Sequence, residues 1–194
     1  MAKVVTDISM SLDGFITASN RRPEEPLGDG GQRLHAWAFG DEGERNRTLL
    51  ADAIAAAGVT IAGRKTYDDS LPWWRADGPT GSARRPVFVV THNAPSESPE
   101  NGVYTFVTGG IERALALAKA AAGDKDISVM GGASIIQQYL AAGLVDEISI
   151  HLVPVLFGNG IRLFEHLGGE HILLEIAETI ETPAAVHLRF RVVK

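Results

Sequence analysis

The sequence predicts an α/β protein in which helices flank both faces of a mixed, mostly parallel sheet that ends in antiparallel strands. Two patterns indicate this class. Over the first three-quarters of the chain, short apolar segments alternate with segments of helical periodicity, as in a parallel sheet with crossover helices. In the last quarter, apolar and polar residues alternate singly, as in half-buried antiparallel strands. No repeat or linker divides the 194 residues, so we expect one domain spanning 1–194.

The individual elements follow from these patterns and from glycine and proline positions. Strands are expected at 4–10, 59–63, 86–91, 103–107 and 127–130, with a short apolar return at 15–16. Helices are expected at 45–57, at 111–122 and from Ile135 to a stop at Gly143, and the first of them is expected to carry an apolar face of Leu49, Leu50, Ala53, Ile54 and Ala57. The antiparallel strands are expected at 148–152, 172–176 and 186–192, with His151 and His187 on them as solvated or interface side chains. Segments 17–45 and 68–85 are expected to be loops, apart from a short helical or irregular stretch at 35–39.

Composition narrows the possible partners. The net charge is −6 and no basic run occurs, which argues against a nucleic-acid or anionic-membrane partner. No apolar run reaches the roughly 18 residues of a membrane span, so we expect a cytoplasmic location. The chain contains no cysteine, which removes disulfides, thiolate metal ligands and cysteine nucleophiles. We expect no metal site, because the Glu-His pairs at 165–166 and 170–171 lack a second clustered pair of ligands.

The stretch 127–136 is the strongest local signal. A strand at 127–130 leads into Gly131 and Gly132, and a helical pattern with Ile135 and Ile136 on one face follows. Backbone N–H groups at such a helix start, together with the positive end of the helix dipole, favour an anion such as a dinucleotide pyrophosphate. The alternative is that the two glycines only make a tight turn. The Rossmann pattern is not met, because no third glycine follows at the required spacing.

Two further strands also end in polar residues. Arg64, Lys65 and Thr66 follow the strand at 59–63, and the strand at 86–91 ends in Thr91 and His92. Ligands of α/β sheets bind beyond the carboxyl ends of the strands. The convergence of three such ends predicts a binding site there.

Five motifs, in order, resemble the dihydrofolate-reductase-like fold and, within it, the reductase domain of the bacterial bifunctional deaminase-reductase of riboflavin biosynthesis. They are Ser9-x-Ser-Leu-Asp-Gly-x-Ile16, Gly63-Arg-Lys-Thr-Tyr67, Val89-Val-Thr-His92, Met130-Gly-Gly-Ala-Ser134 and Gly143-Leu-Val-Asp-Glu147. The segments 154–160 and 163–164 extend the resemblance over nearly the whole chain.

The resemblance implies NADPH as the cofactor. It places the pyrophosphate at the glycine turn, the adenosine and its 2′-phosphate among cations and hydroxyls, and the nicotinamide against Ser9 and Ile16. The remaining cofactor-binding residues that it implies are Gly63, Arg64, Lys65, Thr66, Thr91, His92, Met130, Gly131, Gly132, Ala133, Ser134 and Ile135. The reaction implied is hydride transfer to a small, heterocyclic or sugar-derived substrate.

The substrate and the catalytic groups stay open. Riboflavin-pathway reductases carry a lysine where this chain has Asp7 and a carboxylate where it has Met130. Three hypotheses therefore stand: an NADPH-dependent reductase of another small molecule, the 5-amino-6-(5-phosphoribosylamino)uracil reductase itself, and a dinucleotide-binding regulator without turnover. Catalytic candidates are Asp13, which is otherwise a turn residue, and Asp41. Candidates for the substrate pocket are Asp13, Trp37, Trp73 and Trp74, and the tryptophans are otherwise core anchors.

The apolar run 152–157 predicts a homodimer. Leu152, Val153, Val155, Leu156 and Phe157 exceed what one face of a sheet needs. The C-terminal strands also have an edge that needs protection.

Overall fold

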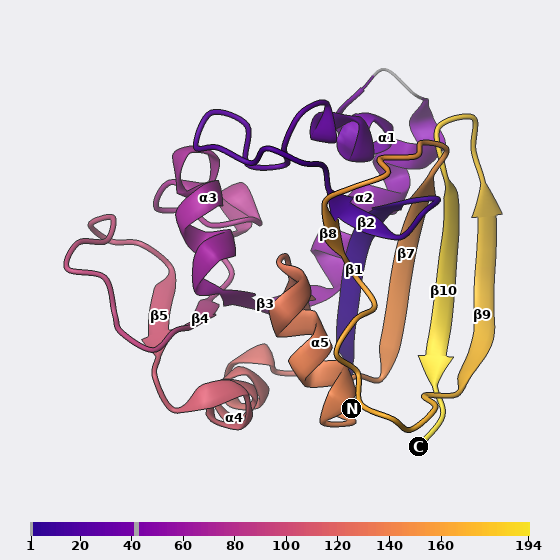
Figure 1. Ribbon diagram of the computed structural model, residues 1–194. Helices are drawn as coiled ribbons and strands as arrows, with labels where there is room; N and C mark the ends of the chain where they lie inside the picture. Colours follow the sequence, from indigo (N-terminus) through magenta and orange to yellow (C-terminus); the bar gives the residue numbers. More distant parts are fainter. Residues whose placement is uncertain (1, 41–42) are drawn as a thin grey trace.

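The computed structural model describes residues 2–40 and 43–194, and its centre is an eight-stranded mixed sheet (Figure 1). The strands lie in the order β5 (Tyr104–Val107), β4 (Val87–Val90), β3 (Ala57–Gly63), β6 (Asp126–Met130), β1 (Val4–Ser11), β7 (Glu147–Val153), β10 (Val186–Val192) and β9 (Leu174–Glu181). The neighbouring pairs from β5 to β7 are parallel, and β10 pairs antiparallel with both β7 and β9. The predicted α/β class with antiparallel C-terminal strands is confirmed.

Helices connect the parallel strands across both faces of the sheet. In Figure 1, α4 (Gly110–Ala122) and α5 (Ala133–Ala141) lie in front of the sheet, and α2 (Glu44–Ala56) lies behind it. The other helical elements are η1 (Gly31–His35), α1 (Ala36–Phe39), α3 (Arg64–Trp74) and η2 (Gly81–Ala83). A small second sheet pairs β2 (Phe15–Thr17) with β8 (Ile161–Arg162) near the carboxyl end of β1.

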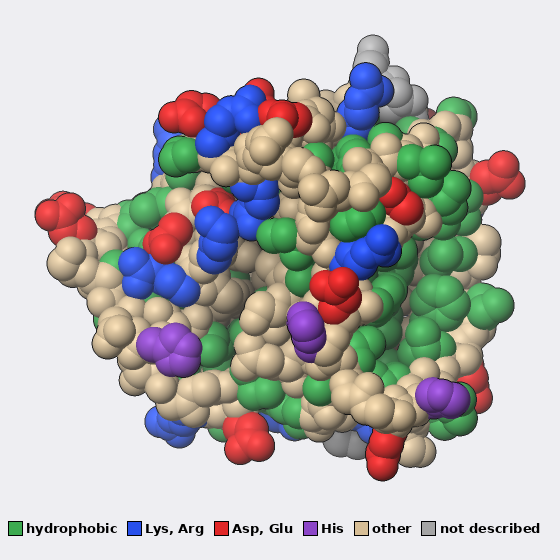
Figure 2. Space-filling model, in the orientation of Figure 1, with side chains coloured by type: hydrophobic (Ala, Val, Ile, Leu, Met, Phe, Trp, Pro, Cys, Tyr) green, Lys and Arg blue, Asp and Glu red, His purple; other side chains and the backbone are tan. Residues whose placement is uncertain are grey.

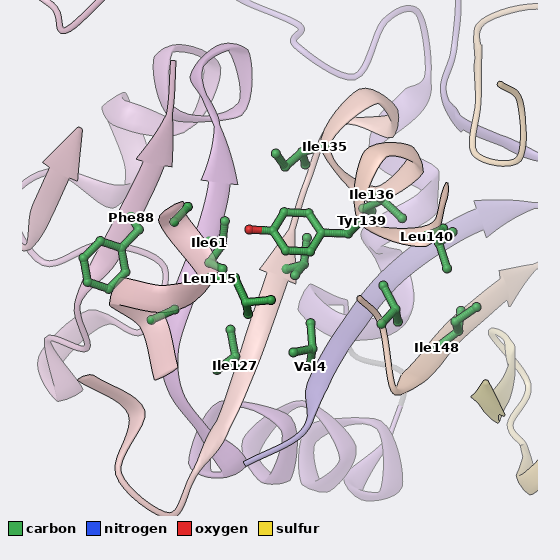
Figure 3. Close-up of a cluster of buried hydrophobic side chains, with 14 of the residues drawn as sticks. Val4, Ile61, Phe88, Leu115, Ile127, Ile135, Ile136, Tyr139, Leu140 and Ile148 are labelled. Carbon is green, nitrogen blue, oxygen red and sulfur yellow. The ribbon is translucent and has the colours of Figure 1, made fainter. Parts of the chain in front are cut away.

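The main core lies between the sheet and the front helices (Figure 3). Tyr139 of α5 is fully buried at its centre, and its hydroxyl donates a 2.8 Å hydrogen bond to the carbonyl of Ile111 in α4. This bond satisfies a polar group that would otherwise be unpaired inside an apolar cluster. Two smaller clusters lie behind the sheet, one around Tyr67 and one around Trp37. The front core therefore fixes α5, and with it the glycine turn that precedes the helix.

Two predictions about local structure are wrong. Segment 68–85 was expected to be a loop, but α3 runs from Arg64 to Trp74 with Pro72 inside it. Pro72 has no N–H to donate to the helix, and α3 ends two residues after it. Helix α2 was expected to bury an apolar face, yet among its described residues only Asn46 is buried. The helix covers its face of the sheet loosely.

The C-terminal strands also differ from their expected pattern. We expected a half-buried strand at 172–176, but β9 spans Leu174–Glu181 and is largely exposed. Conversely, β7 is almost completely buried, including Ser149 and His151. An alternating pattern does not distinguish polar positions that face water from polar positions that face another element. The pattern therefore predicted where these strands lie in the chain but not how deeply they are buried.

Candidate active site

The sheet opens between β1 and β6 at their carboxyl ends. The two strands pair from Val4 with Ile127 to Thr6 with Val129, and beyond this point the described pairing of β1 is with β7 alone. Strand β1 continues to Ser11, whereas β6 gives way to the glycine turn. Such a parting of parallel strands is where open α/β sheets bind ligands. Ser9 lies on β1 beside this opening, and Ile16 follows on β2.

The glycine turn after β6 requires both of its glycines. Gly131 has φ +70°, and a Cβ there would lie 2.3 Å from the Thr66 side chain. Gly132 has φ +37°, and a Cβ there would lie 3.1 Å from Thr66 Oγ1. A side chain at either position would meet backbone strain as well as a close contact. The turn thus lets the start of α5 approach the start of α3 closely.

Two helix N-termini therefore lie side by side at the opening. Helix α3 begins directly after β3, and α5 begins directly after the turn that follows β6, the neighbouring strand. Within the described part of the chain, neither helix has a side-chain cap or an acidic residue in its first turn. The first N–H groups of a helix need acceptors, and its positive dipole end favours an anion. This pair of helix ends is suited to a phosphate or pyrophosphate.

Basic side chains stand near these helix ends. The surface is hollowed between the parts that carry α3 and α5, and basic groups gather on the α3 side (Figure 2). Arg64 is held by Asp68, with N–O distances of 2.8 and 2.9 Å, and donates to the Asn93 carbonyl at 2.9 Å. Lys65 lies 3.5 Å from Asp69 and is largely exposed. The guanidinium is thus pre-positioned beside the turn that follows β4.

The other predicted cofactor residues occupy the same edge. Gly63 ends β3, and Met130 ends β6. Thr91 and His92 follow β4, where the Thr91 hydroxyl donates to the Asn93 carbonyl at 2.8 Å. Residues 133–135 form the first turn of α5, with Ser134 exposed and Ala133 and Ile135 buried. The residues named from the sequence are therefore gathered at one edge, and their role in binding stays a prediction.

Asp13 holds a turn in place. Its carboxylate accepts hydrogen bonds from the Ser11 hydroxyl at 2.6 Å, from Gly158 N–H at 2.7 Å and from Phe157 N–H at 3.1 Å. The Ser11 bond is the largest cause that lowers the pKa of Asp13 to about 2, and the two N–H groups add to it. An ionised carboxylate whose oxygens accept from the protein is suited to joining the turn after β1 to the segment after β7. The second candidate, Asp41, lies outside the described residues.

The tryptophans are divided between core and surface. Trp37 is buried, and its Nε1–H donates to Ser9 Oγ at 2.8 Å. Trp74 packs against the cluster around Tyr67, whereas Trp73 is 63% exposed at the end of α3. Trp37 therefore fills the space on the α2 side of Ser9 instead of standing in an open pocket.

The sequence interpretation missed a polar cluster on the α2 face of the sheet. His151 and His187 were expected to be solvated or to lie in an interface, but both are buried, and they lie beside Asp7. Their rings pack on Trp37, with centroids 4.0 and 4.9 Å from it. Asp7, His151 and His187 face the same side of three neighbouring strands. Recognising this requires the register of the strands, which the sequence does not supply.

Over 2–40 and 43–194, no three His, Asp or Glu side chains are grouped so that they could hold a metal ion. Within the same residues, no helix combines the length and apolarity needed to cross a membrane.

Known structures share the fold of this chain. The fold is that of dihydrofolate-reductase-like proteins: a dihydrofolate reductase from Enterococcus faecalis superposes with a TM-score of 0.61 at 15% identity, covering 99% of this chain and 97% of that one. A putative riboflavin biosynthesis protein from Shewanella sp. PV-4 superposes with a TM-score of 0.76 at 24% identity, covering 99% of both chains.

Residues 2–188 match the model of the RibD C-terminal domain, so this chain belongs to the RibD C-terminal domain family. Among relatives, the Bacillus subtilis (strain 168) protein YwjB is 26% identical over 188 residues, covering 97% of each chain. YyaP of the same organism is 27% identical over 164 residues, covering 84% of this chain and 80% of its own length.

We predict that Asp13→Asn lowers the melting temperature at neutral pH. Because the folded-state pKa is depressed, the ionised carboxylate stabilises the fold above the ordinary carboxyl pKa, and this contribution is lost as the pH falls toward about 2. The difference in melting temperature between wild type and variant should therefore narrow in acid, as followed by circular dichroism. Asp52→Asn, on an exposed residue of α2, is the matched control. A difference that stays constant with pH would contradict the assigned role.

Proposed function

We propose that this protein is an NADPH-dependent reductase of a small, heterocyclic or sugar-derived molecule. The observation that carries the proposal is the pair of uncapped helix N-termini brought together by the Gly131–Thr66 contact at the opening of the sheet. A pyrophosphate is the group that such a pair accommodates, and a dinucleotide is the ligand that carries it. Membership of the RibD C-terminal domain family supports a reductase.

The residues at the strand ends are suited to the parts of this cofactor. The N–H groups at Gly132 to Ser134 would hold the pyrophosphate. Arg64 and Lys65 would pair with the 2′-phosphate, for which a guanidinium has matching donor geometry. Thr66 lies between the two helix starts, within reach of either phosphate group.

The nicotinamide end would lie where the sheet opens. Bound NADPH supplies a hydride, which adds to a C=N or C=O carbon of the substrate. Ser9 and Ile16 would bound the ring with small and apolar surface, which positions it without competing charge. The long segment from Ala18 to η1 approaches α3, because Arg21 forms an ion pair with Asp69. This segment would limit access of water to the nicotinamide end.

The riboflavin-pathway reduction is the narrower alternative. Asp7 argues against this alternative. It stands where those reductases carry a lysine, and it is hydrogen-bonded to His151. A carboxylate fixed in this way repels a phosphorylated substrate instead of attracting it. We therefore favour an uncharged or cationic substrate. A regulator without turnover is distinguished by the absence of NADPH oxidation with every acceptor tested.

Gly132→Val should weaken NADPH binding by about tenfold or more, because the side chain would occupy the place of the pyrophosphate beside Thr66. Cofactor fluorescence at fixed protein concentration measures the dissociation constant. Gly143→Val is the matched control, since Gly143 also has a positive φ, +65°, but a Cβ there meets no atom within 4 Å. It should lose stability without losing NADPH. Undiminished NADPH binding by folded Gly132→Val would mean that the glycines only form a turn.

Arg64→Ala should discriminate between the two nicotinamide nucleotides. Removal of the guanidinium should cost about 1.5–3 kcal/mol of NADPH binding and leave NADH, which lacks the 2′-phosphate, nearly unchanged. Asp68→Ala is the control, because it removes the acidic partner of Arg64 but keeps the guanidinium group itself. Equal losses of NADPH and NADH in Arg64→Ala would assign the arginine a structural role.

We also propose that the protein acts as a homodimer, although through a different surface from the run 152–157. Of that run, Val153 is buried and Leu156 is largely exposed. The more extended apolar surface lies over β9 and β10, at the right of Figure 2, where Leu174 and Ile176 pair with Val192 and Phe190. A second copy would cover this face and the edge of β9.

Light scattering at micromolar concentration should give twice the chain mass of 20.7 kDa. Ile176→Glu, which places a charge at a side chain that is 74% exposed in one subunit, should give the single-chain mass without unfolding it. Glu178→Gln on the same strand should leave the mass unchanged. A wild-type mass of one chain would refute the dimer.

A further inference from the structure

A line of hydrogen-bonded side chains crosses the interior on the α2 face of the sheet. Asp7 Oδ1 lies 2.9 Å from His151 Nε2, and His151 Nδ1 lies 2.7 Å from His187 Nδ1. Beyond them, His187 Nε2 lies 3.2 Å from Asn46 Oδ1 and 3.3 Å from Thr182 Oγ1. Both imidazoles are buried, so each ring nitrogen depends on these partners and not on bulk water. None of these contacts is required by the cofactor site proposed above.

The geometry allows the line to hold one mobile proton. The contact between the two Nδ1 atoms contains a single hydrogen, because one nitrogen donates and the other accepts. With Nε2–H of His151 donated to Asp7 and Nδ1–H of His187 donated to His151, both rings are neutral, and the Thr182 hydroxyl has to turn from the Ala185 carbonyl to donate to His187 Nε2. With one added proton, His151 is the charged ring and donates Nε2–H to Asp7 and Nδ1–H to His187, while neutral His187 donates its Nε2–H to Asn46 Oδ1. The cluster then carries a proton with every ring nitrogen paired.

A second added proton is disfavoured. Burial is the main reason that the pKa of His187 falls to about 4, and His151 lowers it further while Asp7 opposes the shift. Burial and His151 also lower the pKa of His35. The titratable and charged groups facing the cluster from the surrounding elements are Asp7 on β1, His35 on η1, Arg45 on α2, Glu178 on β9, and His187 and Arg189 on β10.

The cluster adjoins the proposed nicotinamide end. Ser9 is the register partner of His151 on adjacent strands, which lie about 4.8 Å apart. Trp37 joins the two, since it donates to Ser9 and its ring packs on His151. Towards α2, Asp7, Ser149 and His151 line a cavity of about 30 Å³. The side chain of Asp7 is 34% exposed and that of His151 is 10% exposed, so Asp7 is the outlet.

We propose that Asp7, His151 and His187 hold and deliver the proton that the reduction consumes. The proposal rests on the proposed function. Hydride addition to the carbon of a C=N or C=O bond moves the π electrons to nitrogen or oxygen, which must gain a proton. The Nε2–H bond of His151 breaks, Asp7 passes that proton to the substrate, and His151 becomes neutral while keeping its proton on Nδ1, which is donated to His187. Solvent then restores the lost proton. Asp7 is the catalytic residue, and the histidines are positioning residues.

If a proton is stored next to the nicotinamide, the binding of the cofactor should depend on pH, and this can be measured without a substrate. The oxidised ring of NADP⁺ is positive and repels the proton, whereas a reduced ring is neutral. As the pH falls from about 8.5 to about 5, the dissociation constant of NADP⁺ should rise relative to that of 1,4,5,6-tetrahydro-NADPH, an acid-stable reduced analogue, by about tenfold or more. Ionisation of the 2′-phosphate affects both ligands equally and cancels in the ratio.

Three variants test the assignment. His151→Gln keeps hydrogen-bonding atoms but cannot hold the proton, so the ratio should become independent of pH. Asp7→Asn, at a partly exposed site that tolerates substitution better, should shift the rise to lower pH because the carboxylate no longer stabilises the charged pair. His171→Gln, on an exposed histidine, should behave as wild type. Isothermal calorimetry supplies both constants at each pH.

The outcomes separate this inference from the function on which it rests. If both nucleotides bind wild type and their ratio stays flat over the pH range, the proton store is wrong and the reductase proposal stands. If neither nucleotide binds, both proposals fail. A pH dependence that persists in folded His151→Gln would place the titrating group elsewhere and also overturn the inference.

Discussion

The close approach of Gly131 to Thr66 is the contact on which the proposed site depends. It brings the N-termini of α3 and α5 together at adjacent strand ends, and it is possible because a glycine at φ +70° leaves the Thr66 side chain room. The front core holds α5 from behind through Tyr139 and Ile136. The orphan N–H groups of two helices are thus fixed in position before any ligand arrives, which reduces the ordering cost of binding.

The sequence predicted the parts of this arrangement that follow from local pattern. The glycine turn, the polar strand ends and the positions of most strands along the chain are short-range features, and the structure has them at nearly the expected residues. Helix α3 was not predicted: Pro72 disfavours a helix locally, whereas Tyr67 of this helix packs on Tyr104 and Phe106. Tertiary contacts of this kind override a local signal.

The polar cluster shows a different limit of sequence reasoning. Asp7, His151 and His187 are separated by up to 180 residues and become neighbours only through the register of β1, β7 and β10. From the sequence alone, a single polar residue in an alternating strand is interpreted as exposed to solvent. The loose cover provided by α2 explains why polar side chains are tolerated on this face: Asn46 and Thr182 supply partners, and Trp37 excludes bulk water from the rings. Burial of these groups then costs little, because each is paired.

The same principle of local pairing reconciles the charge of the protein with an anionic cofactor. A net charge of −6 repels a dinucleotide at long range, but salt at physiological strength screens charges beyond about 8 Å. Within that distance, the proposed site presents uncapped N–H groups, and Arg64 and Lys65 form ion pairs with the exposed Asp68 and the half-buried Asp69. Exposed ion pairs of this kind are weak, so a phosphate can replace a carboxylate partner at small cost. Acidic partners thus keep the basic side chains in place, and a phosphate of the proposed cofactor would take the position of these partners.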